Sequence, residues 1–174
     1  MASSLVFFVI AIVIVLYRIQ KLSFSEIQIS DMKLSCVAFV DNEKIPIKYT
    51  CEGAGLSPQL SLEGIPEGTQ TLALILKDPD APLNTFIHWV VWNIPIVESI
   101  SENSLPDGSV EGTNSTGKVG YFPPCPPSGQ HHYVFYLYAL DTSLTLPQEA
   151  TSKELEQTIT RHVLGTTTLT SIFP

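Results

Sequence analysis

Hydrophobic residues in this chain occur in short runs that are separated by turn signals. Three runs, at 71–76, 88–94 and 132–140, are rich in β-branched and aromatic residues and are apolar at consecutive positions. Consecutive side chains of a strand point to opposite faces of its sheet, so these runs predict central strands that are covered on both faces. Clusters of Pro, Gly, Asn and Asp between the runs predict turns.

One segment near the C-terminus has the pattern of a helix. Thr151 and Glu154 form a capping box, and Leu155, Ile159 and Val163 recur at intervals of four. The glycine two residues beyond Val163 is expected to end this helix. A mainly β chain with one or two peripheral helices favours an antiparallel β-sandwich.

The chain opens with a different pattern. Every residue from 5 to 17 is apolar or aromatic, and the first charged side chains are Arg18 and Lys21. The uncharged stretch predicts a hydrophobic helix about 24 Å long, and no cleavage site of small residues follows it. We therefore expect residues 1–22 to be a membrane anchor or an uncleaved signal, which crosses the membrane through residues 4–19.

The rest of the chain divides into a linker at 23–30 and one folded domain at 31–174, a length that suits a single core. The side of the membrane on which the domain lies stays open. The two basic residues that follow the apolar run favour the cytoplasm. A glycosylation triplet at 114–116 favours the opposite side.

Charge narrows the range of partners. The formal net charge of −8 repels the phosphates of nucleic acids at long range, so a nucleic-acid partner is not expected. Charged residues make up 15% and apolar residues 44% of the chain, which indicates a folded body rather than intrinsic disorder.

The three cysteines are Cys36, Cys51 and Cys125, and they lack the paired short spacing of a zinc site. If 33–39 and 45–51 are strands joined by a turn, Cys36 and Cys51 lie roughly opposite each other. A disulfide between these two residues and a pair of buried free thiols are both consistent with this arrangement.

Two proline-rich motifs carry the candidate chemistry. The first is DPDAP at 78–82, which is followed six residues later by His88. Its prolines restrict their own φ angles and the residues that precede them, so the Asp78 carboxylate is presented rigidly. The second is GYFPPCPPSGQHHY at 120–133, in which His131 and Tyr133 share one face of a predicted strand.

The two motifs together resemble the paired signatures of the phosphatidylethanolamine-binding protein family, also called Raf kinase inhibitor-like proteins. The bacterial and archaeal branch is the more similar one. Supporting segments are IPIKYTCEG at 45–53, LSPQLS at 56–61 and HWVVWNIP at 88–95. The similarity covers roughly residues 31–173.

The resemblance implies an antiparallel Greek-key β-sandwich in which both motifs converge on a cavity that accepts phosphate, acetate or a phospholipid head group. The residues that it places in or around this anion site are Asp78, His88, Tyr121, Cys125, Pro126, Pro127, His131 and Tyr133. Imidazole N–H groups and a phenol O–H are donors that suit an anion. Asp78 is expected to orient a histidine or to keep it charged.

The turn residues Asp80, Ala81 and Pro82 have structural roles in this interpretation. Asp80 is expected to cap backbone amides of its own turn. The resemblance also implies a cis peptide bond between Ala81 and Pro82. His132 is expected to point away from the cavity.

The chain departs from the family pattern at Phe122 and Pro123, where many relatives have glycine. Proline has no N–H to offer an anion, and Phe122 adds bulk at the mouth of the expected cavity. The identity of the ligand therefore does not follow from the resemblance.

The function that we expect is non-catalytic, with no cofactor: a module that binds a phosphate-like anion or a phospholipid head group and inhibits or regulates a protein, either a protease or a kinase. An alternative is a hydrolase with Cys125 as nucleophile, His131 as base and Asp78 as orienting residue. A second alternative is a metal site formed by Asp78, His88 and His131.

Overall fold

The computed structural model describes residues 31–174 and contains two β-sheets that enclose one main hydrophobic core. The strands are β1 (Lys33–Cys36), β2 (Glu43–Lys44), β3 (Leu60–Glu63), β4 (Thr71–Asp78), β5 (Phe86–Ile94), β6 (Ser99–Ile100), β7 (Val110–Glu111), β8 (His131–Leu140) and β9 (Val163–Phe173). The helices are the 3-10 turn η1 (Ile47–Tyr49) and α2 (Ser152–Ile159). The mainly β prediction is confirmed.

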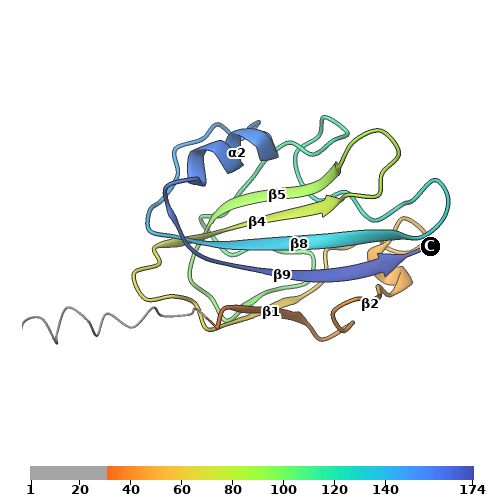
Figure 1. Ribbon diagram of the computed structural model, residues 1–174, viewed down its shortest axis with the longest axis horizontal. Helices are drawn as coiled ribbons and strands as arrows, with labels where there is room; N and C mark the ends of the chain where they lie inside the picture. The colour runs from red at the N-terminus through yellow and green to blue at the C-terminus, as the bar shows by residue number, and fades with distance from the viewer. Residues whose placement is uncertain (1–30) are drawn as a thin grey trace, which may run out of the picture.

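The smaller sheet has the strand order β1-β3-β6, and the larger has the order β2-β9-β8-β4-β5-β7. Figure 1 shows β9, β8, β4 and β5 side by side across the molecule, with α2 beyond β5 in this view and β1 on the opposite side. The pairs are antiparallel except for β2 with β9, which is parallel. The predicted antiparallel strands therefore form most of the body.

Strand β4 shows why the central runs are apolar at consecutive positions. Leu72, Leu74 and Leu76 belong to the core between the two sheets. Ala73 and Ile75 belong to a second cluster, which includes residues of α2. Both faces of the strand are therefore buried, as the sequence pattern predicted.

Helix α2 begins as predicted but ends earlier. The Thr151 side chain accepts from the Glu154 amide, and Glu154 accepts from the Thr151 amide, so the capping box is present. The helix ends at Ile159, and Val163 already begins β9. The prediction that Gly165 ends a helix is wrong, because this residue pairs with Ala139 of β8. The β-branched run that follows favours the strand.

The predicted strand at 45–51 is also wrong, and with it the expected opposition of Cys36 and Cys51. Residues Ile47–Tyr49 form η1, and the Cys51 amide donates to the Pro124 carbonyl. Cys51 forms a disulfide with Cys125, 74 positions further along the chain, and Cys36 is a free, partly buried thiol. The turn at η1 moves Cys51 away from β1 and toward the second motif.

The expected anchor at 1–22 and the linker at 23–30 lie outside the described residues, so both stay predictions. Within residues 31–174, no helix combines the length and the apolar character needed to span a bilayer.

Candidate functional site

Strand order brings the two motifs together at one edge of the larger sheet. Asp78 is the last residue of β4, which lies between β5 and β8. Because both neighbours are antiparallel to β4, their first residues lie beside its end. His131 is the first residue of β8, and His88 is the third of β5. Three side chains from distant positions in the sequence therefore meet in one place.

The centre of the site is a buried pair. Nδ1 of His131 donates to Oδ2 of Asp78 at 2.7 Å, and both residues are buried. A carboxylate accepts only, so Nδ1 of His131 carries a proton and the ring orientation is set. Asp78 thus has the orienting position that was expected of it. Nε2 is the other ring nitrogen of His131.

The prediction that Asp80 caps its own turn is wrong, because Asp78 has that role. Oδ1 of Asp78 accepts the Asp80 amide at 2.9 Å, so Asp78 itself caps the turn. Oδ2 of Asp80 instead accepts the amide of His132 at 2.8 Å and its Nδ1 at 2.6 Å. His132 is exposed and points away from the cavity, as expected. The two Asp–His pairs together join the first motif to the start of β8.

The expected cis bond before Pro82 is a further correction. Every peptide bond within the described part of the chain is trans, including the bond between Ala81 and Pro82. Both residues nevertheless line the cavity.

His88 is held by the second motif through its backbone. Nδ1 of His88 donates to the Phe122 carbonyl at 2.8 Å, and the Phe122 amide donates to the His88 carbonyl at 2.8 Å. Burial lowers the pKa of His88 below its ordinary value of 6.5, against the opposing effects of the Phe122 carbonyl and the Asp78 carboxylate. The neutral ring, with its proton on Nδ1, then has a hydrogen-bond acceptor at Nε2.

A cavity of about 240 Å³ lies between these groups. Its walls are mostly apolar, and its polar side chains are Asp78, His88 and His131. The complete lining is Asp78, Ala81, Pro82, Phe86, His88, Phe122, Cys125, Pro127 and His131. A small, largely apolar cavity with a few convergent polar groups is typical of ligand sites.

Aromatic rings form one wall of the cavity. The Phe86 ring lies 4.8 Å from the His88 ring and 5.6 Å from the Phe122 ring, between centroids. Sequence reasoning missed Phe86, although its position two residues before His88 puts both on one face of a strand. Phe122 adds bulk to the wall, and its amide is already used by His88.

Two other candidate residues lie near the cavity rather than in its lining. Tyr133 is fully buried, and its ring meets His88 edge-on at 5.2 Å. Burial raises the pKa of Tyr133, so its phenol keeps its proton. Its hydroxyl has no hydrogen-bond partner among residues 31–174. Pro126 is next to lining residues but is not one of them.

Tyr121 lies elsewhere, which corrects its assignment to the anion site. Its ring meets Trp89 edge-on at 5.4 Å, and its hydroxyl donates to the Tyr49 carbonyl at 3.1 Å. It lines a second pocket, because neighbouring residues of an extended segment point to opposite sides.

Two observations concern the residues named in the enzyme alternatives. Cys125 is bonded to Cys51, so its sulfur is not available as a thiolate nucleophile in this structure. The metal hypothesis needs Asp78, His88 and His131 to converge as ligands. Within the part of the chain that the structure describes, no three His, Cys, Asp or Glu side chains form such a group.

Comparison with known proteins agrees with the motifs. The sequence model described as phosphatidylethanolamine-binding protein matches residues 36–174. The chain belongs to this family. A UPF0098 protein from Methanothermobacter thermautotrophicus is 45% identical over 148 residues, which are 82% of this chain and 98% of the relative. The predicted family is therefore confirmed, and the archaeal source of this relative agrees with the predicted branch.

Solved structures of phosphatidylethanolamine-binding proteins show the same fold. A putative homologue from Chlamydia trachomatis has a TM-score of 0.80 at 36% identity, covering 83% of this chain and 98% of its own. E. coli YbcL, described as a new member of the mammalian family, has a TM-score of 0.78 at 28% identity, covering 82% of this chain and 98% of its own.

Proposed function

We propose that this domain is a non-catalytic module that binds a phosphate-like anion, either free or as a phospholipid head group. One observation carries the proposal. His88 and His131 line the same cavity, and each uses its Nδ1 in a hydrogen bond within the protein. Each ring therefore has Nε2 left for a ligand, while Nδ1 holds the ring in place.

The neutral ring of His88 favours a phosphate that carries a hydrogen. Neutral His88 accepts at Nε2, so it suits the P–OH group of a phosphate. Donation from Nε2 of His131 to a P–O oxygen would be a charge-assisted bond, in which the charge of the ring lies beside the Asp78 carboxylate at Nδ1. One ligand then satisfies a donor and an acceptor. A fully deprotonated anion has no hydrogen for His88.

The size of the cavity limits what enters it. About 240 Å³ accommodates a phosphate group with a short substituent. Phe86, Phe122 and Pro127 give apolar contacts to that substituent. A larger head group or an acyl chain would have to remain outside the opening.

The surroundings of the cavity support an interaction with a protein, which the family resemblance suggests is a protease or a kinase. Leu83 follows the first motif and is 93% exposed, and the neighbouring Pro82 and Pro127 are also exposed and line the cavity. We propose that this apolar rim contacts the protein target while the cavity holds the anion. An exposed large apolar side chain beside a pocket is typical of a contact site. The predicted anchor at 1–22 would keep this rim near a membrane.

The experiment is a titration of the full chain with inorganic phosphate and with phosphoethanolamine, followed by NMR of the histidine rings. We expect both ligands to shift the ring signals of His88 and His131 in a saturable way. His88→Ala and His131→Ala should each lower the affinity at least tenfold. His162→Ala is the matched control, since His162 also pairs with an aspartate but lies outside the cavity.

Phosphate and phosphoethanolamine distinguish the two sources of the anion. Tighter binding of phosphoethanolamine supports a lipid head group, and tighter binding of phosphate supports a free anion. If neither ligand shifts the two rings, or if His162→Ala has the same effect as His131→Ala, the proposal is wrong. Turnover of ester or peptide substrates that is lost in His131→Ala would support an enzyme instead.

A further inference from the structure

A second pocket lies on the other side of two segments that also line the first cavity, namely β5 and the second motif. On β5, His88 lines the first cavity and the next residue, Trp89, lines the second. In the second motif, Phe122 lines the first cavity and the preceding residue, Tyr121, lines the second pocket. The alternation of side chains along extended backbone accounts for both pairs. The second pocket has a volume of about 330 Å³.

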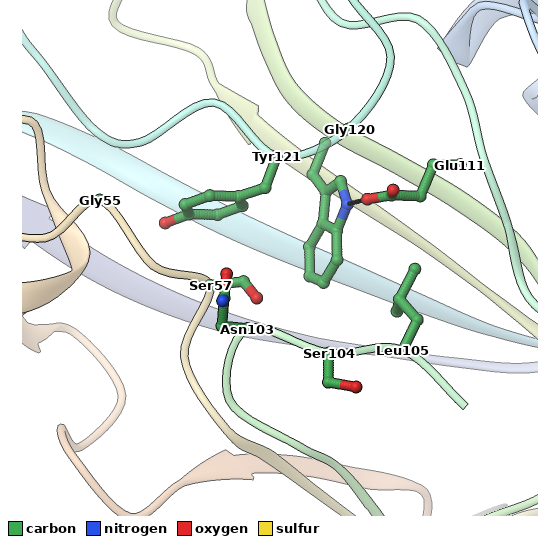
Figure 2. Close-up of a pocket in the computed structure, with 9 residues that line it drawn as sticks. Gly55, Ser57, Asn103, Ser104, Leu105, Glu111, Gly120 and Tyr121 are labelled. Atoms are coloured by element: carbon green, nitrogen blue, oxygen red, sulfur yellow. Dashed lines mark hydrogen bonds between the residues drawn. The ribbon is translucent and has the colours of Figure 1, made fainter. Parts of the chain in front are cut away.

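Strands of the larger sheet and loops next to the smaller sheet contribute to this pocket. Trp89 and Glu111 come from β5 and β7 of the larger sheet. Ser57 precedes β3, and Asn103 follows β6, both in the smaller sheet. Figure 2 shows the side chains of Ser57 and Asn103 on the side of the pocket opposite the Tyr121 ring. The complete lining is Gly55, Ser57, Trp89, Asn103, Ser104, Leu105, Glu111, Gly120 and Tyr121.

One oxygen of the Glu111 carboxylate accepts a hydrogen bond within the described domain, and the other does not. Nε1 of Trp89 donates to its Oε1 at 2.7 Å, the contact drawn as a dashed line in Figure 2. Within residues 31–174, no hydrogen bond or ion pair reaches Oε2. Gly120 lies directly beside this group, and a Cβ at that position would be 3.6 Å from Oε1. The glycine therefore leaves the carboxylate uncovered on the pocket side.

The opposite wall supplies uncommitted polar groups. Ser57 is a largely buried residue that lines the pocket, and no side-chain hydrogen bond joins it to another residue of the described part of the chain. The side chains of Asn103 and Ser104 are exposed, line the pocket and also make no hydrogen bond to residues 31–174. The hydroxyl of Ser57 and the side-chain amide of Asn103 are therefore free to donate to or accept from a ligand in the pocket. Tyr121 differs, because its hydroxyl is bonded to Tyr49.

We propose that this pocket binds a small organic cation that carries hydroxyl groups, such as a protonated amino alcohol. Oε2 of Glu111 is a charged acceptor for the ammonium group, and the indole of Trp89 offers an aromatic surface that attracts cations. Ser57 and Asn103 are suitable partners for the hydroxyls. No Lys or Arg lines the pocket, and the net charge of −8 attracts cations at long range.

The test uses serinol (2-amino-1,3-propanediol), a cation at neutral pH, and glycerol, which has the same number of heavy atoms but no charge. The readout is the indole N–H signal of Trp89 in the full chain. Trp89 and Trp92 are the two tryptophans, so Trp92→Phe assigns the signal. We expect serinol to shift it in a saturable way and glycerol to bind at least tenfold more weakly.

Glu111→Gln is the decisive variant, because the amide oxygen can still accept from Trp89 while the charge is lost. It should lower serinol affinity about tenfold, and Asn103→Ala should lower it by a smaller factor. Glu67→Gln is the matched control, since Glu67 is an exposed carboxylate outside the pocket. Three results would each overturn the proposal. They are equal binding of serinol and glycerol, unchanged serinol affinity in Glu111→Gln, and no shift of the indole signal at about 100 mM serinol.

Discussion

Asp78 and His131 form a buried pair at 2.7 Å, while Asp80 and His132, two and one positions further along, form an exposed pair at 2.6 Å. The side chains of the first pair are 5% and 7% exposed, and those of the second are 40% and 48% exposed. The same chemistry therefore occurs in two environments. The two pairs serve as controls for each other.

Asp78→Ala should destabilise the domain far more than Asp80→Ala. Loss of Asp78 leaves a buried imidazole and the Asp80 amide without their partner, at a cost of about 3 kcal/mol. Loss of the exposed carboxylate of Asp80 should cost about 1 kcal/mol or less. Urea unfolding of both variants at pH 7 measures the difference. Equal losses would mean that the buried pair has no special structural role.

His88 should make the stability of the domain depend on pH. Because burial lowers its pKa in the folded state, the unfolded state binds a proton more readily. The contribution of His88 is thus fully present above its ordinary pKa of 6.5 and is lost as pH falls from there toward the folded pKa.

The measurement is the free energy of unfolding at pH 7.5 and at pH 5.5. His88→Asn can keep a donor to the Phe122 carbonyl without a titrating ring, so it should lose less stability on acidification than the natural chain. His162→Asn, at an exposed site, provides the comparison. An identical pH dependence in His88→Asn and the natural chain would contradict the prediction.

The Cys51–Cys125 disulfide should stabilise the fold and shape the first cavity. It closes a loop with a sequence separation of 74 residues, and a loop of that length corresponds to roughly 4 kcal/mol in the chain-entropy model. Cys51→Ser with Cys125→Ser should lower stability by about 2–4 kcal/mol. Phosphate affinity should also fall, because Cys125 lines the cavity.

Cys36→Ser is the matched single-cysteine control for the disulfide, since Cys36 is the free thiol of the described residues. It should retain phosphate affinity. If reducing agent leaves the unfolding midpoint of the natural chain unchanged, the pairing of Cys51 with Cys125 is wrong.

Phe122 should limit the size of the ligand. Its ring lies 5.8 Å from the His88 ring and forms part of the cavity wall. Phe122→Ala should therefore raise the affinity for glycerophosphoethanolamine relative to phosphate, because removal of the ring widens the cavity. Isothermal titration of both ligands measures this ratio. Phe122→Leu, which keeps an apolar side chain, should change the ratio less, and no change in Phe122→Ala would exclude a role in selection.

Local patterns predicted the parts of the molecule that depend on local physics. Apolar residues at consecutive positions of β4 and β5 predicted central strands, because both faces of such strands need cover. The same prediction was only half right for β8, which is central but is buried on one face and exposed or half-buried at alternate positions on the other. The capping box at Thr151 predicted the start of α2, because its hydrogen bonds lie within four residues. The periodicity of β8 also predicted that His131 and His132 would point in opposite directions.

Contacts between distant segments could not be predicted in the same way. The 45–51 segment reads as a strand, yet Pro46 and η1 turn it toward Cys125. Val163 continues the spacing of a helix, yet pairing with β8 makes it the start of β9. At 45–51 a partner far along the chain outweighed the local preference. At Val163 the helical spacing competed with the β-branched run that follows, and pairing with β8 completed the strand.

The sequence by itself determined the family, the central strands and the set of residue types at the first cavity, because rigid proline turns and strand periodicity are local properties. The tertiary structure alone decided which of these residues meet. It placed Asp78 between His88 and His131, sent Tyr121 and Trp89 to the second pocket, and joined Cys51 to Cys125. Each of these outcomes depends on strand order and on the path of the loops. Both are set by contacts between distant segments, so the sequence of one segment does not reveal them.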